Sequence, residues 1–274
     1  MKQQRFIYAG CDLGVRTAKV VITEDRKILA SEVVPYKSFP HKAAITAMEG
    51  ALHKAGVSRD GKIPCLSTGF GHKAVHFADW SAPDITCIIR GSRALNPEVR
   101  TIIDVGGHSL IASNNDHNGN LIETAVVEEC AAGKGLFIEE MAKALEITME
   151  ELAVYPLDSK NPTRITNMCV VLAESEVISF INEGYSRFDV LAGMVLSVAT
   201  TIASIAGRID ILPEVAMTGG VAKNAVVVKE IERQLGIKFT DLKGVDPQVV
   251  AAFGAALLAE ERDVVGMKPG MKRR

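Results

Sequence analysis

Cys11-Asp12-Leu13-Gly14-Val15-Arg16-Thr17-Ala18-Lys19 places a carboxylate and a glycine between two apolar runs, Phe6–Cys11 and Ala18–Thr23. Glycine lets a backbone turn sharply, so the stretch predicts two strands joined by a tight turn. The N–H groups of such a turn can cradle a phosphate, and a carboxylate can hold Mg²⁺ through water. Asp12, Gly14, Thr17 and Lys19 are therefore candidate nucleotide-binding residues, although for this stretch taken alone an ordinary Asp/Gly hairpin turn is the favoured explanation.

Two further glycine-rich turns follow along the chain. The first is Ile103-Asp104-Val105-Gly106-Gly107-His108-Ser109, where Gly106 and Gly107 allow close backbone approach and His108 either positions a water or caps the turn. The second is Met217-Thr218-Gly219-Gly220-Val221-Ala222-Lys223-Asn224. Its two glycines carry no side chains, so a nucleotide base or ribose could pack directly against their backbone. Each alone is a common turn, but the order Asp–Gly, Asp–Gly–Gly, Gly–Gly favours a nucleotide site.

The pattern strand, Asp-x-Gly turn, strand, turn, strand occurs twice, around Asp12 and around Asp104. This weak duplication predicts an α/β protein of two similar lobes, with residues 1–97 in the first and residues 98–274 in the second. Apolar periodicity predicts helices at these ranges: 40–55, 133–146, 148–153, 169–183, 188–209, 225–235 and 247–261.

Bulk composition limits the classes of function. The 274 residues are 47% hydrophobic and 23% charged, with a formal net charge of −2, which favours neither nucleic acid nor an anionic membrane as a partner. We find no apolar run of about 18 residues and no signal peptide, so we expect a cytoplasmic protein. The 5 cysteines fit reduced thiols better than a disulfide framework.

Cys130 and Cys169 each stand at the expected start of a helix, in Glu128-Glu129-Cys130-Ala131-Ala132-Gly133-Lys134-Gly135 and in Cys169-Val170-Val171-Leu172-Ala173-Glu174-Ser175-Glu176. The N–H groups and dipole of a helix N-terminus stabilise an anionic group. Two thiolates beside a nucleotide fold indicate ATP hydrolysis coupled to something that thiolates hold, such as an iron–sulfur cluster.

The three turns, in this order and spacing, resemble the superfamily of acetate kinase, sugar kinases, Hsp70 and actin. The resemblance covers almost the whole chain. It implies two ribonuclease-H-like lobes with an inter-lobe nucleotide cleft, two phosphate loops and one adenosine loop. Gly14, Thr17, Lys19, Gly106, Gly107, Gly219, Gly220 and Asn224 would then bind ATP, and Asp12, Asp104 and His108 would organise Mg²⁺ and the attacking water.

The cysteine motifs together with the third turn resemble the ATP-dependent electron activators. These are activators of (R)-2-hydroxyacyl-CoA dehydratases and the ATPase subunits of benzoyl-CoA reductase. The resemblance implies a [4Fe–4S] cluster shared between two subunits, with Cys130 and Cys169 as ligands. A two-fold axis would supply the four thiolates. It also implies ferredoxin as electron donor and a cluster-bearing acyl-CoA reductase or dehydratase component as acceptor.

The chain departs from the family pattern in the first phosphate loop at Val15-Arg16, in the second at His108-Ser109, and at Lys134. His108 stands where activators usually have a glutamine, and Lys134 stands where they usually have a small polar residue; we hypothesise that this cation raises the cluster potential. The loop departures and the run 94–100 favour a D-type benzoyl-CoA reductase subunit paired with a related ATPase subunit. The alternatives are a homodimeric dehydratase activator, and outside the family a small-molecule kinase or a non-catalytic actin-like module.

Overall fold

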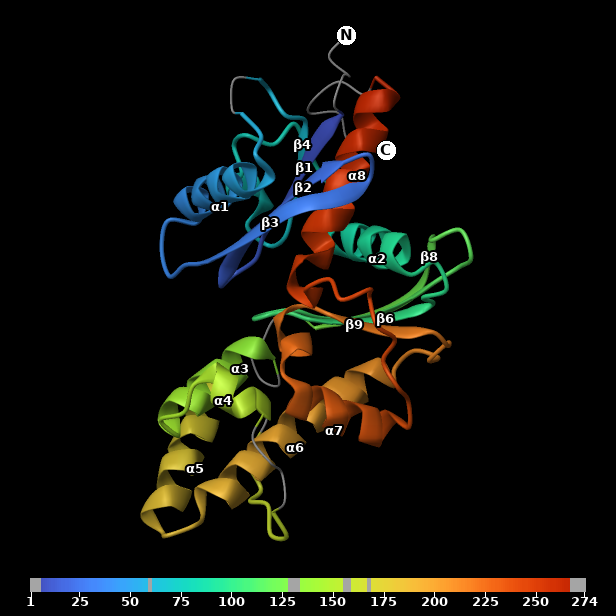
Figure 1. Cartoon of the computed structure of the whole chain (residues 1–274). Helices are drawn as coiled ribbons and strands as arrows, with labels where there is room; N and C mark the ends of the chain where they lie inside the picture. Colours follow the sequence, from blue (N-terminus) through green and yellow to red (C-terminus); the bar gives the residue numbers. More distant parts are fainter. Residues whose placement is uncertain (1–5, 59–60, 128–133, 155–158, 167–168, 267–274) are drawn as a thin grey trace. The chain divides into compact units, whose positions relative to one another are not determined.

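The computed structural model describes residues 6–58, 61–127, 134–154, 159–166 and 169–266. They form two compact units, each built around one β-sheet (Figure 1). One unit runs to Glu98 and resumes at Leu242, and the other spans Val99–Asp241. The predicted α/β class and the two similar lobes are confirmed.

The sheet of the first unit has the order β3-β2-β1-β4-β5. Its strands are β1 (Ile7–Leu13), β2 (Thr17–Glu24), β3 (Lys27–Pro35), β4 (Cys65–Thr68) and β5 (Trp80–Ser81). The first three strands pair antiparallel, whereas β4 runs parallel to β1 and to β5. Asp12 therefore lies near the end of a central strand that is paired on both sides.

Three helices belong to this sheet: α1 (Pro40–Ala55), α2 (Asp84–Leu95) and α8 (Val250–Val264). Side chains alternate along a strand, and in β1 the alternation separates two cores. Ala9, Cys11 and Leu13 join the apolar cluster that contains the buried face of α1, while Tyr8 joins a cluster with Ala255 of α8. The helices α1 and α8 thus cover opposite faces of the sheet (Figure 1).

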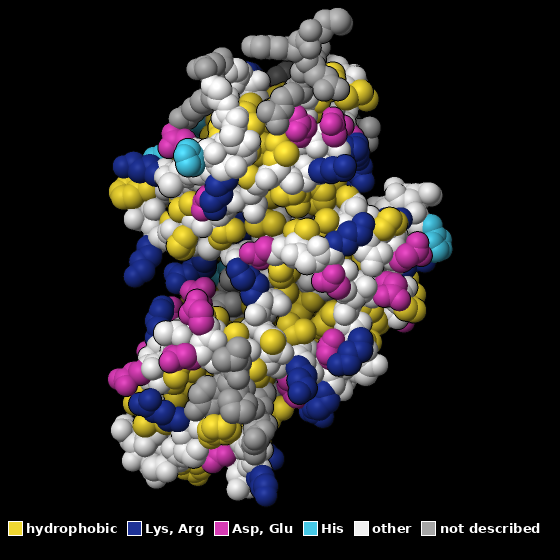
Figure 2. All heavy atoms as spheres, viewed as in Figure 1, with side chains coloured by type: hydrophobic (Ala, Val, Ile, Leu, Met, Phe, Trp, Pro, Cys, Tyr) yellow, Lys and Arg dark blue, Asp and Glu magenta, His cyan; other side chains and the backbone are white. Residues whose placement is uncertain are grey.

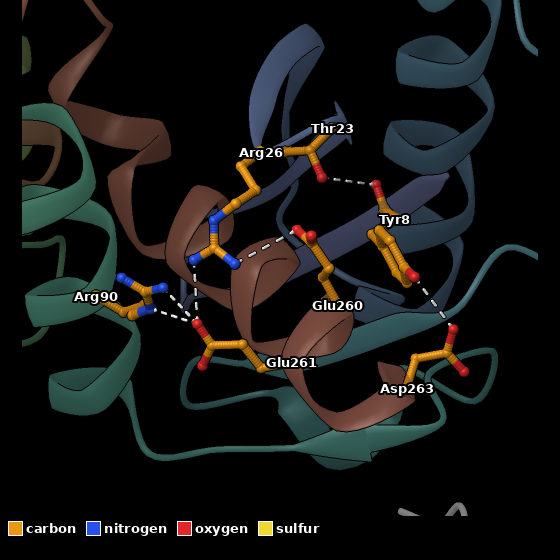
Figure 3. A network of polar contacts seen from close by, with 7 residues as sticks. All are labelled: Tyr8, Thr23, Arg26, Arg90, Glu260, Glu261 and Asp263. Atoms are coloured by element: carbon orange, nitrogen blue, oxygen red, sulfur yellow. Dashed lines mark hydrogen bonds and ion pairs between the residues drawn. The ribbon is translucent and has the colours of Figure 1, made fainter. Parts of the chain in front are cut away.

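Polar contacts fix the carboxyl-terminal half of α8 to the sheet and to α2 (Figure 3). Glu261 accepts hydrogen bonds from Arg90 Nε at 2.9 Å and from Arg26 Nη2 at 3.1 Å. The Tyr8 hydroxyl donates to Asp263 Oδ2 at 3.2 Å. Partly exposed ion pairs of this kind stabilise little on their own, so they chiefly set the orientation of a helix that apolar packing already holds.

The sheet of the second unit has the order β8-β7-β6-β9. Its strands are β6 (Thr101–Val105), β7 (Leu110–Asn115), β8 (Leu121–Val127) and β9 (Val215–Thr218). Its helices are α3 (Gly135–Ala144), α4 (Met149–Val154), α5 (Val170–Asn182), α6 (Arg187–Ala206) and α7 (Ala225–Leu235). One apolar core joins Ile103 and Leu110 of the sheet to buried residues of α3, α5, α6 and α7.

Helix α6 is long and apolar enough to meet the length and composition criterion for a membrane span, although no run of that length was recognised in the sequence. Its apolar character has another explanation, because Val190, Met194, Val198 and Ile202 lie in the core of the second unit. On the face shown in Figure 2, basic and acidic side chains of the described residues are interspersed over the surface.

The structure corrects the extent of the lobes. Residues from Leu242 onward group with the first unit, whereas all of 98–274 was expected in the second. The physical reason is close packing: an added Cβ on Gly254 of α8 would lie 1.8 Å from the Cys87 carbonyl oxygen of α2, and one on Gly10 of β1 would lie 2.0 Å from that of Ala252. Only glycines permit these contacts.

Candidate functional site

The first predicted turn places a buried ion pair at the end of the central strand. Asp12 lies opposite Lys19 in the β1–β2 register, and Lys19 Nζ donates to Asp12 Oδ2 at 2.7 Å. The turn between them is closed by a hydrogen bond from Gly14 N to Thr17 O at 3.0 Å, and the Tyr36 hydroxyl donates to Gly14 O. The structure therefore brings together all the residues predicted for the first phosphate loop.

The second unit places Asp104 at the equivalent end of its own central strand. Asp104 is 9% exposed, and its Oδ1 accepts a hydrogen bond from Thr218 Oγ1 at 2.6 Å. Thr218 is its register partner on the parallel strand β9. Position 111, opposite Asp104 on β7, holds an isoleucine, where the first unit has Lys19 opposite Asp12. The two carboxylates thus share a backbone position, but the cation opposite Asp12 has no counterpart at position 111.

Gly106, Gly107 and His108 form the turn between β6 and β7, as predicted. Gly106 N donates to Ser109 O at 2.9 Å and closes the turn. The His108 side chain is half-buried, and its carbonyl oxygen accepts a hydrogen bond from Lys134 Nζ at 2.9 Å. The ammonium group of Lys134, which was expected to act on the cluster, therefore lies at the second phosphate turn.

The third turn joins β9 to α7 through a short 3-10 helix, Gly220–Lys223. Gly219 has a φ of +85° and sits so close to β6 that a Cβ would lie 2.4 Å from the Val105 carbonyl oxygen. Asn224 caps α7, since its Oδ1 accepts from Val227 N at 3.0 Å. Its buried Nδ2 has no hydrogen-bond partner among the described residues, so its two N–H donors are unsatisfied there.

The duplication extends to residues that were not singled out in the sequence. Thr68 is the register partner of Asp12 on β4, as Thr218 is of Asp104 on β9. Each threonine precedes a glycine of positive φ, and a Cβ on Gly69 would lie 2.5 Å from Asp12 Oδ1. The Thr-Gly pair that recurs at Thr68-Gly69 and Thr218-Gly219 is the sequence signal that marks these positions.

Asp84, the first residue of α2, was also missed. Its Oδ1 accepts hydrogen bonds from Gly69 N at 2.8 Å and from Thr68 Oγ1 at 3.0 Å. Burial, followed by the nearby charge of Asp12, raises the pKa of the Asp84 carboxyl above its ordinary value. Asp84 therefore holds the backbone beside Asp12 in place and adds a second carboxylate to that end of the sheet.

The cysteines fall into two classes. Burial raises the pKa of Cys11 and of Cys87 to about 12, and it raises that of Cys65 well above the ordinary value, so these thiols are inert packing residues. Cys169 is half-buried and precedes α5 as its N-cap residue, with no capping hydrogen bond from its side chain. Among the described residues its sulfur forms no disulfide, which is compatible with a role as a metal ligand.

The second predicted ligand, Cys130, lies outside the described residues. Within the ranges that the structure describes, no group of three or more His, Cys, Asp and Glu residues is arranged to hold a metal ion. A single cysteine at the start of α5 fits a site completed by other residues, because one thiolate cannot hold a cluster alone.

Comparison with known proteins decides the family. The family model described as the BadF/BadG/BcrA/BcrD ATPase family matches residues 9–259. This chain belongs to that family. A relative from Anaerotignum propionicum, an activator of lactoyl-CoA dehydratase, is 37% identical over 92% of this chain and 96% of its own length. The D-type benzoyl-CoA reductase subunit of Thauera aromatica is 28% identical over 92% of each chain.

A solved dehydratase activator has the same fold. The activator of the 2-hydroxyisocaproyl-CoA dehydratase from Clostridium difficile, solved with bound ADPNP, superposes with a TM-score of 0.87 at 33% identity. The match covers 97% of this chain and 100% of that one. The predicted two-lobed actin-like ATPase fold is confirmed. The preference for a benzoyl-CoA reductase subunit is not supported, because the dehydratase activators are more similar.

Proposed function

We propose that this protein is an ATP-hydrolysing activator of a 2-hydroxyacyl-CoA dehydratase, acting as a homodimer. The observation that carries the proposal is its likeness, over more than nine-tenths of each chain, to the activators of lactoyl-CoA and 2-hydroxyisocaproyl-CoA dehydratases, at 37% and 34% identity. The cytoplasm remains the expected location.

Each glycine turn has a role in binding ATP. Gly14, Thr17 and the buried Lys19 would hold phosphate in the first unit, and Gly106 and Gly107 would do so in the second. Gly219 and Gly220 would face the adenosine, towards which the unpartnered Nδ2 of Asn224 can donate a hydrogen bond. Asp12 and Asp104 would hold Mg²⁺ through its waters, as ionised carboxylates do in phosphate sites.

His108 is proposed to position the attacking water. Its ring is half-buried, and its backbone is fixed on one side by the Gly106–Ser109 hydrogen bond and on the other by Lys134. A ring nitrogen of a histidine held in this way can accept a hydrogen bond from a water molecule and so orient it.

Cys130 and Cys169 would hold the [4Fe–4S] cluster together with the same two residues of a second copy. When bound, the cluster would supply a low-potential electron, accepted from ferredoxin and given to a cluster-bearing dehydratase component. Cys169 suits this role because the N–H groups in the first turn of a helix, here α5, have no partner within the helix and can stabilise a thiolate.

A second candidate is a benzoyl-CoA reductase ATPase subunit in a heterodimer. It is favoured only by the 28% identity to the D-type subunit of the Thauera aromatica reductase. The two candidates differ in the protein that accepts the electron, a dehydratase component or a benzoyl-CoA reductase component. Identifying the electron acceptor therefore distinguishes them.

The test is an anaerobic activation assay. The purified chain, reduced with titanium(III) and supplied with Mg-ATP, is mixed with a dehydratase component and, in a parallel reaction, with the remaining subunits of a benzoyl-CoA reductase. We expect ATP-dependent dehydration of a 2-hydroxyacyl-CoA, absent with ADPNP and absent in Cys130→Ser and Cys169→Ser. ATP-dependent reduction of benzoyl-CoA without dehydration would establish the second candidate instead, and activity in neither would refute both.

A further inference from the structure

The start of α3 is bonded residue by residue to the second phosphate turn. Lys134 Nζ donates to His108 O at 2.9 Å. Gly135 N donates to Gly106 O, and Leu136 N donates to Gly107 O, each at 3.0 Å. Three consecutive residues of the helix start thus contact three consecutive residues of the turn.

This contact engages the first backbone N–H groups of the helix, which otherwise bond to water or to a capping side chain. The first N–H groups of an α-helix have no partner within the helix, and α3 has no capping hydrogen bond from the side chain of its N-cap residue. The carbonyl oxygens of the turn take that place at Gly135 and Leu136. A displacement of the turn would therefore break the hydrogen bonds that Gly135 N and Leu136 N donate to it.

Lys134 is fully buried, and burying an ammonium group is expensive. Its hydrogen bond to His108 O fixes the backbone at the residue proposed to position water. The packing beside it is equally close, because a Cβ on Gly135 would lie 3.1 Å from Gly106 O and 3.2 Å from Gly107 Cα. The turn and the helix start are in contact without space to slide.

Helix α3 is in turn anchored in the core of its unit. Phe137, Ile138 and Met141 are buried in the cluster that also contains Ala173 and Val177 of α5. A rigid helix transmits a displacement at its first turn along its length. In sequence, α3 follows shortly after Cys130, and α5 begins directly after Cys169.

We propose that Lys134 is a positioning residue that couples the second phosphate turn to α3, so that nucleotide bound at Gly106–His108 changes how firmly the start of α3 is held. The inference rests on the proposed function for the presence of nucleotide at this turn. It assigns Lys134 a role at the nucleotide, in place of the direct effect on the cluster that its charge alone indicated.

The test measures amide hydrogen exchange, resolved to single residues, in the full-length protein with and without Mg-ADPNP. The amides of Gly135 and Leu136 report directly on the contact, and that of Gly106 reports on the turn itself. In the wild type we expect ADPNP to slow exchange at all three by at least about 10-fold. In Lys134→Met we expect slowing at Gly106 to persist and that at Gly135 and Leu136 to fall below about 2-fold.

Methionine keeps the approximate length of the side chain and removes the ammonium group that donates to His108 O. Lys134→Arg, which retains a donor, is expected to restore part of the protection. Lys143→Met is the matched control on the same helix, because the Lys143 side chain is 59% exposed and pairs with Glu140 one turn away. It should behave as the wild type does.

Protection at Gly135 and Leu136 that is equal in Lys134→Met and the wild type would overturn the proposal. A Lys134→Met variant whose cluster potential changes while the protection of Gly135 and Leu136 does not would also overturn the proposal. That result is the one expected of a charge that acts directly on the cluster. The proposed function is tested by other measurements, namely iron content and activation of a dehydratase. Failure of either can be distinguished from failure of this proposal, because the hydrogen-exchange experiment uses neither.

Discussion

Asp12 and Lys19 form a buried ion pair, with side chains only 13% and 9% exposed. Removing one partner of such a pair leaves a buried charge, which costs about 3 kcal/mol or more. We therefore expect Asp12→Ala to lower the free energy of unfolding by about 3 kcal/mol and Asp12→Ala/Lys19→Met to recover most of that loss. Urea denaturation measures both, and a double variant as unstable as the single one would refute the coupling.

Asp84 gives a prediction on pH. A carboxyl whose pKa is raised by folding contributes stability that is present at low pH and is lost as pH rises through the folded-state pKa. Asp84→Asn keeps the Oδ1 that accepts from Gly69 N and Thr68 Oγ1. The variant should therefore gain stability relative to the wild type as the pH rises from the ordinary carboxyl pKa of 3.8 through the raised pKa of the folded protein. A stability difference that is constant over this interval would contradict the prediction.

The cysteines are predicted to differ in reactivity. Iodoacetamide reacts with thiolates, and burial both covers Cys11, Cys65 and Cys87 and raises their pKa. In the folded, iron-free protein Cys169 should be alkylated at least about 10-fold faster than these three. Peptide mass mapping measures the rates, with urea-unfolded protein as the control in which all react. Equal protection of Cys169 would remove the basis for assigning it as a ligand.

The sequence predicts the glycine turns that contain or follow Asp12 and Asp104, because the three glycine motifs are local patterns. It did not suffice for Asp84, whose contacts to Thr68 and Gly69 join parts of the chain that are distant in sequence. Nor did it place the Lys134 ammonium at His108 O, since only the fold brings those residues together.

Among the elements, α1 and α7 begin and end at the predicted residues, because each has a clear apolar period and a glycine directly after its last residue. Helix α2 was not predicted. Its Ile85, Ile88 and Ile89 favour a strand, and Gly91 weakens a helix. Packing against α8 stabilises the helix. Because α8 lies far along the chain, the local sequence does not reveal this contact.

The contact of α8 with α2 and β1 can be tested through its glycines. Gly254→Ala would place a Cβ 1.8 Å from the Cys87 carbonyl oxygen, and overpacking against backbone costs roughly 3 kcal/mol or more. We expect a large loss of stability in thermal unfolding. Gly61→Ala is the control, because its Cβ would meet nothing within 4 Å. Equal melting temperatures of the two variants would show that α8 packs otherwise.

At the scale of the molecule, the two units repeat one design. The orders β3-β2-β1-β4 and β8-β7-β6-β9 correspond strand by strand, with Asp12 and Asp104 at matching ends. The sequence predicted the duplication from the spacing of two Asp-x-Gly motifs. It did not predict the return of the chain to the first unit at Leu242, because nothing local marks which sheet α8 will cover.

We propose that two copies of this chain share one [4Fe–4S] cluster. The most direct test is native mass spectrometry of the anaerobically purified full-length chain, with iron and sulfide analysis, beside Cys169→Ser. We predict a dimer carrying a single [4Fe–4S] cluster, equal to about two irons per chain, and loss of iron in the variant. A chain that holds no iron after anaerobic reconstitution, or a full cluster on each monomer, would contradict the claim.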